Sequence, residues 1–388
     1  MKKIIIVNNN MKVGGVQKSL HNLLWELGDS YEVTLCLFRA VGPYMDLLPP
    51  WVKVISCRSL FRYLGVSYGD CLGWQKLVRG VLALICKVCG REAVLKLLLA
   101  SQRTLPETYD CAISFLHNGR NRSFYGGVQE FVLHRVKAKR KVAFLHCDYR
   151  SCGGDYAANN RNLARFDWIA ACSDGCRSAF LEVLPELEEK CVTVRNCHRY
   201  GQIRELADRE PITYDSACRN VVMVSRLSHE KGIERALTAV QQAALAGVPV
   251  TLHLVGGGGQ EAQLRKLAQD LNIGAHVRFY GEQSNPYRYV KHADLLLLTS
   301  YHEAAPMVIE EAACLGVPVL TTQTTSSTDM VTAAGLGWVC GNDQQQISST
   351  LLEILMDAEF LARKKQALTC KQADNQEALQ QFRNVIGE

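Results

Sequence analysis

The stretch SYHEAAPMVIEEAACLGVPVL, residues 300–320, combines a proline, two glutamates and a glycine in a mostly apolar segment. Pro306 suits the first turn of a helix, because its missing amide hydrogen is not needed there and its φ is already helical. Gly316 suits the end of that helix, and the apolar VPVLTT that follows reads as a strand. The stretch therefore predicts a loop, a helix over about 306–315 and a buried strand.

The two glutamates of this stretch indicate a ligand site. Glu303 is expected in the loop, and Glu311 is expected inside the helix. A carboxylate on a loop between strand and helix, followed by free backbone amides at the helix N-terminus, suits a ligand that is rich in hydroxyls and partly anionic. Sugar and ribose hydroxyls fit that description.

Strand-like apolar runs alternate with helical stretches along the whole chain. Continuous apolar strands separated by helices indicate parallel sheets covered on both faces. The rhythm occurs twice, which predicts an α/β protein of two Rossmann-like, doubly wound domains that face each other across a cleft. The runs are KIIIVNN, YEVTLCLF, VKVIS, YDCAISFL, RKVAFLH and DWIAACS in the first half, and NVVMVSRL, VTLHLVG, HVRFYGE, DLLLLTS and PVLTT in the second.

The boundary between the two domains is expected near residues 197–220, a polar stretch without a strand-like run. At 388 residues the chain is long enough for two domains. We predict an N-terminal domain over 1–205 and a C-terminal, ligand-holding domain over 206–371. The last helix, about 372–388, is expected to pack back on the N-terminal domain.

The composition favours a soluble globular protein, with 48% hydrophobic and 21% charged residues. The net charge of +6 permits attraction to phosphates or to an anionic membrane but falls short of a nucleic-acid-binding signature. The sixteen cysteines lack paired framework spacing, which favours a reducing cytoplasm over a disulfide scaffold. CKVC at 86–89 has no second pair at ligand spacing, so we expect no metal there.

The apolar runs of the chain are too short for targeting or spanning segments. MKKIIIVNNN at the N-terminus holds only four strongly apolar residues in a row, which suits a first strand rather than a signal peptide. The longest apolar window, VLALICKVC, is interrupted by a lysine and is too short to cross a bilayer. We therefore expect a cytoplasmic protein.

Two further loops of the second half bear on the ligand. Arg226 and Lys231 lie five residues apart where a strand ends, a plausible clamp for a diphosphate. Gly256, Gly258 and their neighbours open a helix after the next strand, where backbone could approach a ligand closely. Alone, the glycines also fit a plain turn, and the two cations also fit a solvated surface.

Two elements of the second half resemble those of the retaining glycosyltransferases with the GT-B fold, specifically glycosyltransferase family 4, also called glycosyl transferases group 1. VSRLSHEKGIERALTA, residues 224–239, is similar to that family's Gly-Arg-Leu…Lys-Gly element, with Ser225 in place of the usual glycine. EAAPMVIEE, residues 303–311, is similar to its Glu-x7-Glu element, with Ala304 and Ala305 where glycine and an aromatic residue are common.

The first half resembles the family more loosely. NNNMKVGGVQKSL is similar to the glycine loop after the first strand, which would bring Gly14 and Gly15 near the donor phosphates. VAFLHCDYR is similar to the strand whose following histidine, here His146, lies near the transferred sugar. SFLHNGRNR is similar to a loop that faces the acceptor. For each of these, a purely structural role stays open. Weaker candidates are Asn118, Arg120 and Asp148.

The resemblance implies transfer of a hexose or N-acetylhexosamine from a nucleotide sugar, UDP favoured over GDP, with retention of anomeric configuration. The acceptor would be a saccharide or a lipid-linked saccharide in cell-surface polysaccharide or glycolipid assembly. Arg226 and Lys231 would stabilise the leaving diphosphate without a metal or other cofactor, Glu303 would bind the sugar and Glu311 the ribose. The other residues expected to contact the donor are Gly14, Gly15, Gly256, Gly258, Ala304, Ala305, Pro306, Met307 and Val308.

Residues 57–103 hold eight Lys or Arg and only two acidic residues among many large apolar side chains. Helices of this kind could lie on the anionic inner face of a membrane and meet a lipid-linked acceptor. They could equally cover the first domain's sheet with the cations in solvent. The sequence leaves both open.

Three other functions remain as alternatives. A nucleotide-sugar 2-epimerase of the GT-B fold is the nearest. A nicotinamide dehydrogenase needs Gly-x-Gly-x-x-Gly after the first strand, and NNNMKVGG lacks that spacing. A binding module without activity is disfavoured because Arg226, Lys231, Glu303 and Glu311 are all present.

Overall fold

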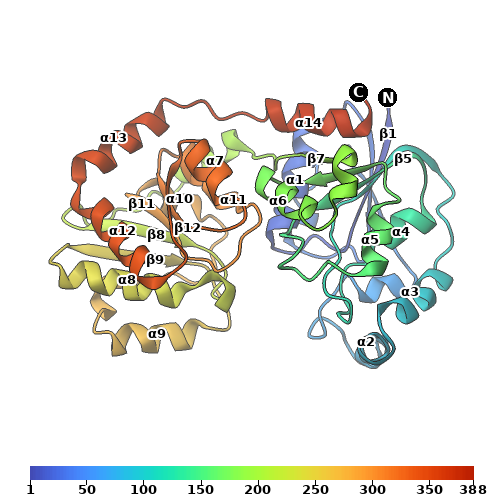
Figure 1. Cartoon of the computed structure of the whole chain (residues 1–388), viewed down its shortest axis with the longest axis horizontal. Coiled ribbons are helices and arrows are strands. Elements are labelled where there is room, and N and C mark those ends of the chain that lie inside the picture. The colour runs from blue at the N-terminus through green and yellow to red at the C-terminus, as the bar shows by residue number, and fades with distance from the viewer. The chain divides into compact units, whose positions relative to one another are not determined.

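The computed structural model describes all residues, Met1–Glu388, as two compact units (Figure 1). Unit 1 comprises Met1–Cys197 together with Asn375–Glu388, and unit 2 comprises His198–Asp374. Each unit contains one parallel sheet with helices packed against it. The α/β class with two doubly wound domains is thereby confirmed.

Unit 1 has a seven-stranded sheet in the order β3-β2-β1-β4-β5-β6-β7, and every neighbouring pair is parallel. The order reverses between β1 and β4. Its strands are β1 (Lys3–Asn8), β2 (Glu32–Leu37), β3 (Lys53–Ser56), β4 (Thr108–Ser114), β5 (Lys137–Leu145), β6 (Trp168–Ala171) and β7 (Cys191–Thr193). Its helices are α1 (Gly15–Glu26), α2 (Trp74–Cys89), α3 (Arg91–Ala100), α4 (Val128–Arg135), α5 (Ala157–Leu163), α6 (Asp174–Leu181) and α14 (Gln376–Ile386).

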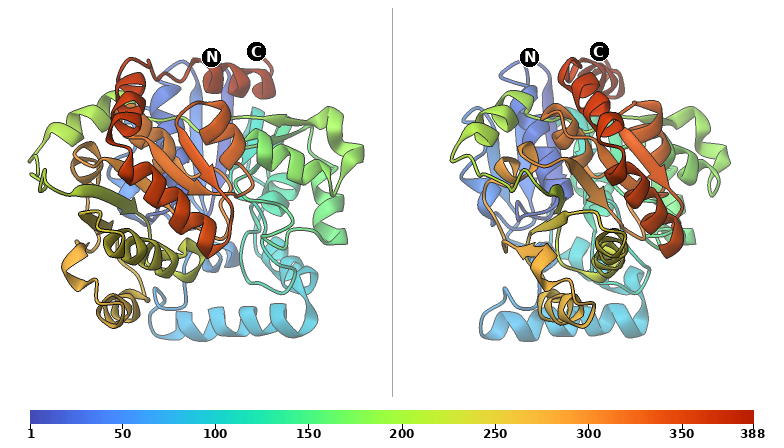
Figure 2. Two further views of the ribbon diagram at one scale, coloured as in Figure 1. Left: turned by 60° about the vertical axis from the view of Figure 1, so that its left-hand side comes forward. Right: turned by 90° about the vertical axis from the view of Figure 1, so that its left-hand side faces the viewer.

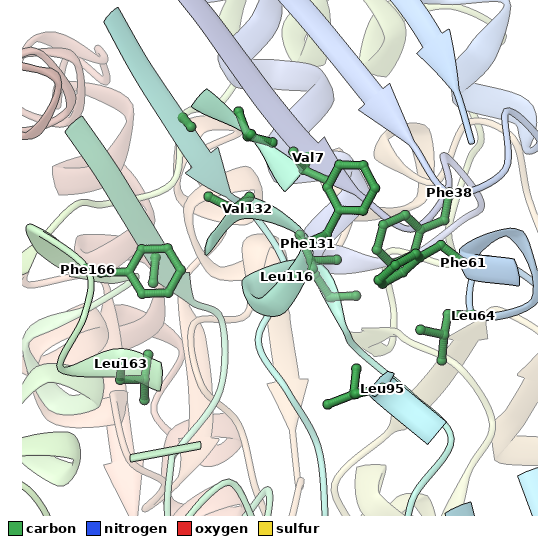
Figure 3. Close-up of a cluster of buried hydrophobic side chains, with 14 of the residues drawn as sticks. Val7, Phe38, Phe61, Leu64, Leu95, Leu116, Phe131, Val132, Leu163 and Phe166 are labelled. Carbon is green, nitrogen blue, oxygen red and sulfur yellow. The ribbon is translucent and has the colours of Figure 1, made fainter. Parts of the chain in front are cut away.

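Both faces of the unit 1 sheet are covered by apolar side chains. Strand β1 shows this directly, since Ile5 and Val7 belong to one core cluster while Ile4 and Ile6 belong to the other. The first cluster includes the packed rings of Phe38, Phe61 and Phe131 that are drawn in Figure 3. The second includes Phe382 of α14, which explains why the C-terminal helix belongs to unit 1.

Unit 2 repeats the same winding with six strands in the order β10-β9-β8-β11-β12-β13, again all parallel. Its order reverses between β8 and β11. The strands are β8 (Arg219–Val224), β9 (Val250–Val255), β10 (Val277–Phe279), β11 (Leu295–Leu298), β12 (Val319–Thr322) and β13 (Gly337–Cys340). The helices are α7 (Tyr200–Asp208), α8 (Ile233–Leu245), α9 (Glu261–Asp270), α10 (Tyr287–Lys291), α11 (Met307–Cys314), α12 (Gln344–Met356) and α13 (Ala358–Thr369).

All eleven strand-like runs of the sequence are strands, and the sequence missed only the edge strands β7 and β13. Each of these is short and only partly buried, so neither carries a continuous apolar run. The expected division at 205/206 falls inside α7. The structure divides the chain at 197/198 because Ile203 and Ala207 of α7 pack against Tyr287 of α10 in unit 2.

None of the helices combines the length and the apolar character that crossing a bilayer requires. The sixteen cysteines are all free. Cys86 and Cys89 of the CKVC stretch lie on α2, the first buried and the second exposed.

Candidate functional site

The candidate site of unit 2 lies where its strand order reverses. In doubly wound sheets, ligands bind beyond the carboxyl ends of the strands at this switch point. The loops that follow β8 and β11 meet there, and they carry Arg226, Lys231 and Glu303. The position of these residues in the fold is therefore the one that a ligand site requires.

Lys231 and Glu303 are brought into direct contact. The Lys231 Nζ lies 2.6 Å from Glu303 Oε1, and the side chains are only 20% and 11% exposed. Ser300 Oγ also donates to Glu303 Oε1, at 2.7 Å. Glu303 Oε2 makes no hydrogen bond within the protein, and a lysine ammonium has three donors. Both groups therefore keep bonding capacity for a ligand, and Glu303 is not a solvated surface charge.

The two loops are fixed to each other by the backbone around Gly232. Thr299 Oγ1 donates to the carbonyl of Gly232 at 2.7 Å, and Tyr301 N donates to the carbonyl of Glu230 at 3.0 Å. Gly232 has a φ of +57°, and a Cβ added there would lie 2.2 Å from the Thr299 carbonyl oxygen. Only glycine fits this approach. The position of Lys231 beside Glu303 is thus built into the fold.

Arg226 lies in a more open setting than the sequence suggested. Its side chain is 74% exposed and pairs with Glu230 through Nη2 and Oε1 at 3.2 Å. The structure does not join Arg226 and Lys231 as one preformed clamp. An exposed pair of this kind contributes only about 0–1 kcal/mol, so Arg226 can leave Glu230 for a stronger anion at little cost.

The glycines after β9 are required by close backbone contacts, which could not be predicted from the sequence. A Cβ at Gly256 would lie 1.9 Å from the Ser225 carbonyl oxygen, and one at Gly258 would lie 2.3 Å from that of Leu227. Leu227 N also donates to the Gly257 carbonyl at 2.9 Å. These glycines hold the loop of Arg226 in place, whether or not they also approach a ligand.

Helix α11 begins and ends within one residue of its expected bounds. Pro306 is its N-cap residue and Met307 its first helical residue. Ala304, Ala305 and Val308 are partly exposed around this N-terminus, where the first amides of a helix lack intrahelical partners. Glu311, one helical turn further in, is buried at 3% exposure, which excludes a simple surface role.

Gly14 and Gly15 of unit 1 are not required by the backbone conformation or by close packing. Gly14 precedes α1 with an extended φ of 172°, a conformation open to any residue, and an added Cβ would meet only the flexible Gln17 side chain. A Cβ at Gly15 would meet nothing within 4 Å. The loop lies at the carboxyl end of β1, beside the switch point of unit 1.

Two histidines follow the neighbouring strands β4 and β5. Burial lowers the pKa of His146 to about 3, helped by the charge of His117, and burial lowers the pKa of His117 to about 4. The Nε2 of His146 and the Nδ1 of His117 are buried and make no hydrogen bond. The His146 ring packs against Phe115, with centroids 4.7 Å apart. Both imidazoles are therefore neutral at pH 7.

His117 is a candidate that the sequence reasoning passed over. The loop SFLHNGRNR drew attention to Asn118 and Arg120, whereas His117 is the residue of this loop that contributes to the lowered pKa of His146. The signal was available, since both histidines stand just beyond the carboxyl ends of strands that the sequence had identified, and adjacent parallel strands end at the same edge.

Asn118 belongs to a buried polar network. It accepts from Arg91 Nη2 at 2.8 Å and donates to Gln129 and Asn159, each at 3.0 Å. Arg91 also forms a buried ion pair with Glu130, at 3.5 Å and about 5% exposure or less. Asn118 links several buried polar side chains of unit 1 and therefore has a structural role here.

The two remaining weak candidates lie on turns. Asp148 Oδ1 accepts from the backbone of Arg150 and Ser151, at 3.0 and 3.1 Å, and so fixes a turn after β5. The stem of Arg120 lies against Gly153, which has a φ of +72°.

No group of three or more His, Cys, Asp and Glu side chains is arranged to hold a metal ion.

Comparison with known proteins bears most strongly on unit 2. Residues 208–369 match the family model of glycosyl transferases group 1. Over 132 residues, the chain is 31% identical to the lipopolysaccharide glucosyltransferase WaaG of Escherichia coli, covering 32% of this chain and 34% of that protein. It is 33% identical over 116 residues to the lipopolysaccharide core biosynthesis glycosyltransferase LpsE of Rhizobium meliloti, covering 30% and 33%. These matches span about a third of the curated relatives' length.

Solved structures are similar over the whole chain. The Anabaena protein Alr3699/HepE, determined in complex with UDP and glucose, superimposes with a TM-score of 0.68 at 19% identity over 100% of this chain and 99% of that one. WaaG, a glycosyltransferase involved in lipopolysaccharide biosynthesis, gives 0.64 at 15% identity over 99% and 100%. The likeness establishes the GT-B fold.

Proposed function

We propose that this chain, whose residues 208–369 belong to the glycosyl transferases group 1 family, is a retaining glycosyltransferase. It moves a hexose or N-acetylhexosamine from a nucleotide sugar to a saccharide or lipid-linked acceptor. The observation that carries the proposal is the contact of Lys231 with Glu303 at the switch point of the family-matched unit. A cation beside a carboxylate suits a ligand with a diphosphate at one end and sugar hydroxyls at the other.

The donor is proposed to be a UDP-sugar. The Anabaena protein of the same fold was determined with UDP and with glucose, which favours this nucleotide over GDP. The relatives named for lipopolysaccharide and core biosynthesis favour an acceptor in cell-surface polysaccharide or glycolipid assembly. Work on such an acceptor fits a cytoplasmic enzyme that associates peripherally with the inner face of the membrane.

Each site residue has a role in this proposal. Lys231 and Arg226 neutralise the charge that grows on the leaving diphosphate, so no divalent ion is needed. Glu303 accepts a hydrogen bond from a sugar hydroxyl through Oε2. Glu311 accepts hydrogen bonds from the ribose hydroxyls. The neutral imidazole of His146 bonds a sugar hydroxyl as the anomeric carbon becomes cationic. Gly14 and Gly15 leave room for the donor, as do the residues around the α11 N-terminus, 304–308.

Retention of the anomeric configuration follows from the side on which the acceptor attacks, which is also the side where the leaving phosphate can take the proton. The acceptor hydroxyl attacks the anomeric carbon from the side that the diphosphate leaves, and a phosphate oxygen of the leaving group takes the hydroxyl proton. The bond from the anomeric carbon to the phosphate oxygen breaks as the bond to the acceptor oxygen forms. No carboxylate is required as a nucleophile on the opposite face, in contrast to a retaining glycosidase.

A panel of nucleotide sugars tests the proposal. The correct donor should raise the melting temperature and be slowly hydrolysed to free nucleoside diphosphate, and NMR of the product should give the donor's anomeric configuration. Glu303→Gln should lose discrimination between donor sugars while keeping affinity for free UDP. An inverted product would contradict retention, and a panel in which no nucleotide sugar binds would overturn the function.

A nucleotide-sugar 2-epimerase of the same fold is the alternative. It would need no acceptor and would change the configuration at the second carbon of the sugar. Stoichiometric release of nucleoside diphosphate that depends on added acceptor therefore separates the two.

A further inference from the structure

A cavity of about 430 Å³ lies beside the edge strand β3 of unit 1. One wall is the loop that follows β3, residues 56–59, and the other is formed by residues 101–105 of the loop that joins α3 to β4. Between these loops the chain forms α2 and α3, and Figure 2 shows α2, in light blue, as one straight helix at the rim of unit 1. His117 and His146, which follow β4 and β5, do not line this cavity, nor does any other candidate site residue.

The two walls of the cavity are fixed by hydrogen bonds. Ser101 Oγ accepts from Leu60 N at 3.1 Å, and Leu60 is the first residue of a short 3-10 helix after β3. This bond ties the first wall to the C-terminal end of α3. The Arg135 side chain donates to the Leu99 carbonyl at 2.6 Å, and Leu105 N donates to the Arg135 carbonyl at 2.8 Å. The second wall is therefore held in place by α4.

The lining of the cavity carries two cations and no acidic residue. Arg58 belongs to the first wall and Arg103 to the second. Both are exposed, and neither side chain makes an ion pair or a hydrogen bond within the protein. Glu107, the acidic residue closest to Arg103 in the sequence, pairs with Lys53 instead, at 2.8 Å. Both guanidinium groups therefore keep their full bonding capacity for a ligand.

Serine hydroxyls supply further donors. Ser56 and Ser59 line the cavity, and Ser59 Oγ is buried and makes no hydrogen bond. A buried polar group without a partner destabilises a protein, and a bound ligand that accepts from this hydroxyl would remove that cost. The apolar part of the lining is Cys36, which belongs to the core of unit 1, with Ile55 and Leu105, which pack against that core. The cavity thus combines cations, an unused hydroxyl and an apolar surface.

We infer that this cavity binds a small phosphate monoester, with the phosphate held between Arg58 and Arg103. A guanidinium group can donate two parallel hydrogen bonds to phosphate oxygens, and the Ser59 hydroxyl adds a third kind of donor. The volume lies within the range of small-molecule sites, about 300–1,000 Å³, so the cavity also has room for the body of the ester. The inference goes beyond the proposed function and does not depend on it, because no donor-site residue takes part.

Calorimetric titration with glucose 6-phosphate tests the cavity. The full chain carrying Lys231→Ala is the parent protein, so that binding of the phosphate at the donor site is weakened. The parent should bind the ester, and adding Arg58→Gln with Arg103→Gln should weaken the affinity by about tenfold or more, since charge-assisted hydrogen bonds are lost. Adding Arg363→Gln instead is the matched control, because Arg363 is an exposed arginine of α13 in unit 2, and this variant should bind as the parent does.

Cys57 provides a second measurement inside the cavity. It lines the cavity as a partly exposed free thiol, so the bound ester should slow its alkylation by iodoacetamide, measured by peptide mass spectrometry. Cys370, an exposed free thiol of unit 2, should be alkylated at the same rate with and without the ester. Glucose, which lacks the phosphate, should protect neither thiol. Ser59→Ala should reduce the protection of Cys57 but not abolish it, because both arginines remain.

Three outcomes would overturn the inference. They are absence of binding by the Lys231→Ala chain at millimolar ester, binding that Arg58→Gln with Arg103→Gln leaves unaltered, and equal affinity for inorganic phosphate and for glucose 6-phosphate, which would make the cavity a site for the free ion. The arginine variants should keep the melting temperature of their parent, because neither guanidinium has a partner to lose. All these measurements are independent of transferase activity, so their failure is distinguishable from failure of the proposed function.

Discussion

The switch points of the two units differ in how they treat charge. In unit 2, Lys231, Glu303, Arg226 and Glu230 remain partly or largely open to solvent, and the backbone around them is fixed by glycines. In unit 1, His146 Nε2 and His117 Nδ1 are buried, and the two histidines are kept neutral. The first setting suits a charged ligand such as a diphosphate. The second suits neutral hydroxyls.

The difference also separates residues that serve the fold from residues that serve a ligand. Unit 1 contains one buried ion pair, Arg91 with Glu130, inside a network in which Asn118 bonds to both partners. In unit 2, the ion pair of Lys231 and Glu303 lies in the candidate site at the switch point. Substitutions of the unit 1 pair should therefore act on stability, while substitutions of the unit 2 pair should act on turnover.

The largest effect is expected from Glu130→Ala. The change leaves the buried Arg91 guanidinium without its carboxylate, and breaking a buried pair in this way costs about 3–5 kcal/mol. Urea unfolding at pH 7 measures it. Glu92→Ala is the matched control, because its pair with Arg161 is exposed on both sides and contributes about 0–1 kcal/mol. Similar losses in the two variants would contradict the contrast.

Lys231→Ala should come next, as a loss of turnover. Removing one preorganised charge from a developing anion costs about 10²–10³-fold in rate. Arg226→Ala should cost less, because its guanidinium is mostly solvated and must first leave Glu230. Steady-state rates with the best donor measure both, and Lys266→Ala serves as the control. A larger effect at Arg226 than at Lys231 would show that the order is wrong.

The sequence predicted the fold well because strand and helix patterns are local. Eleven strands, the α11 helix and the two doubly wound domains follow from apolar runs, Pro306 and Gly316, whereas the GT-B class came from the resemblance to a known family. The edge strands β7 and β13 escaped because a half-buried edge carries no such run. Contacts between loops that are distant in the sequence could not be predicted from it. Nothing in the one-dimensional pattern indicates that Gly256 lies against Ser225 or that Lys231 reaches Glu303.

Glycine-to-alanine substitutions distinguish glycines that the fold requires from glycines that it does not require. Gly256→Ala should destabilise the protein by about 1–3 kcal/mol, because the added Cβ meets the Ser225 carbonyl and the φ of +140° is strained for any other residue. Gly259→Ala, where nothing lies within 4 Å, should leave the stability nearly unchanged. Thermal melting of the two variants makes the comparison.

Gly15→Ala extends that comparison to unit 1. Its Cβ also meets nothing, so the melting temperature should not fall, and alanine even favours a helix at this position. If a donor approaches the backbone there, turnover should fall while stability is kept. Unchanged turnover would assign Gly15 to the turn alone.

The last prediction concerns acid, and it rests on the neutral histidines. An unfolded histidine has a pKa of about 6.5, whereas the folded pKa of His146 is about 3 and that of His117 about 4. Above pH 6.5 both states are neutral and neither residue affects stability. As pH falls from 6.5 towards 4, the unfolded chain takes up protons that the folded protein does not.

Each of these two histidines should therefore reduce the free energy of unfolding by up to about 1.4 kcal/mol per pH unit in that window. His146→Gln should flatten the loss measured by urea unfolding between pH 7 and pH 5, whereas His302→Gln, an exposed residue on the loop of Glu303, should not. His146→Gln should also lower turnover more than donor affinity, because a neutral imidazole helps only once charge develops on the sugar. A wild-type rate that rises as His146 protonates near pH 6 would show instead that this side chain is solvated and acts as a cation.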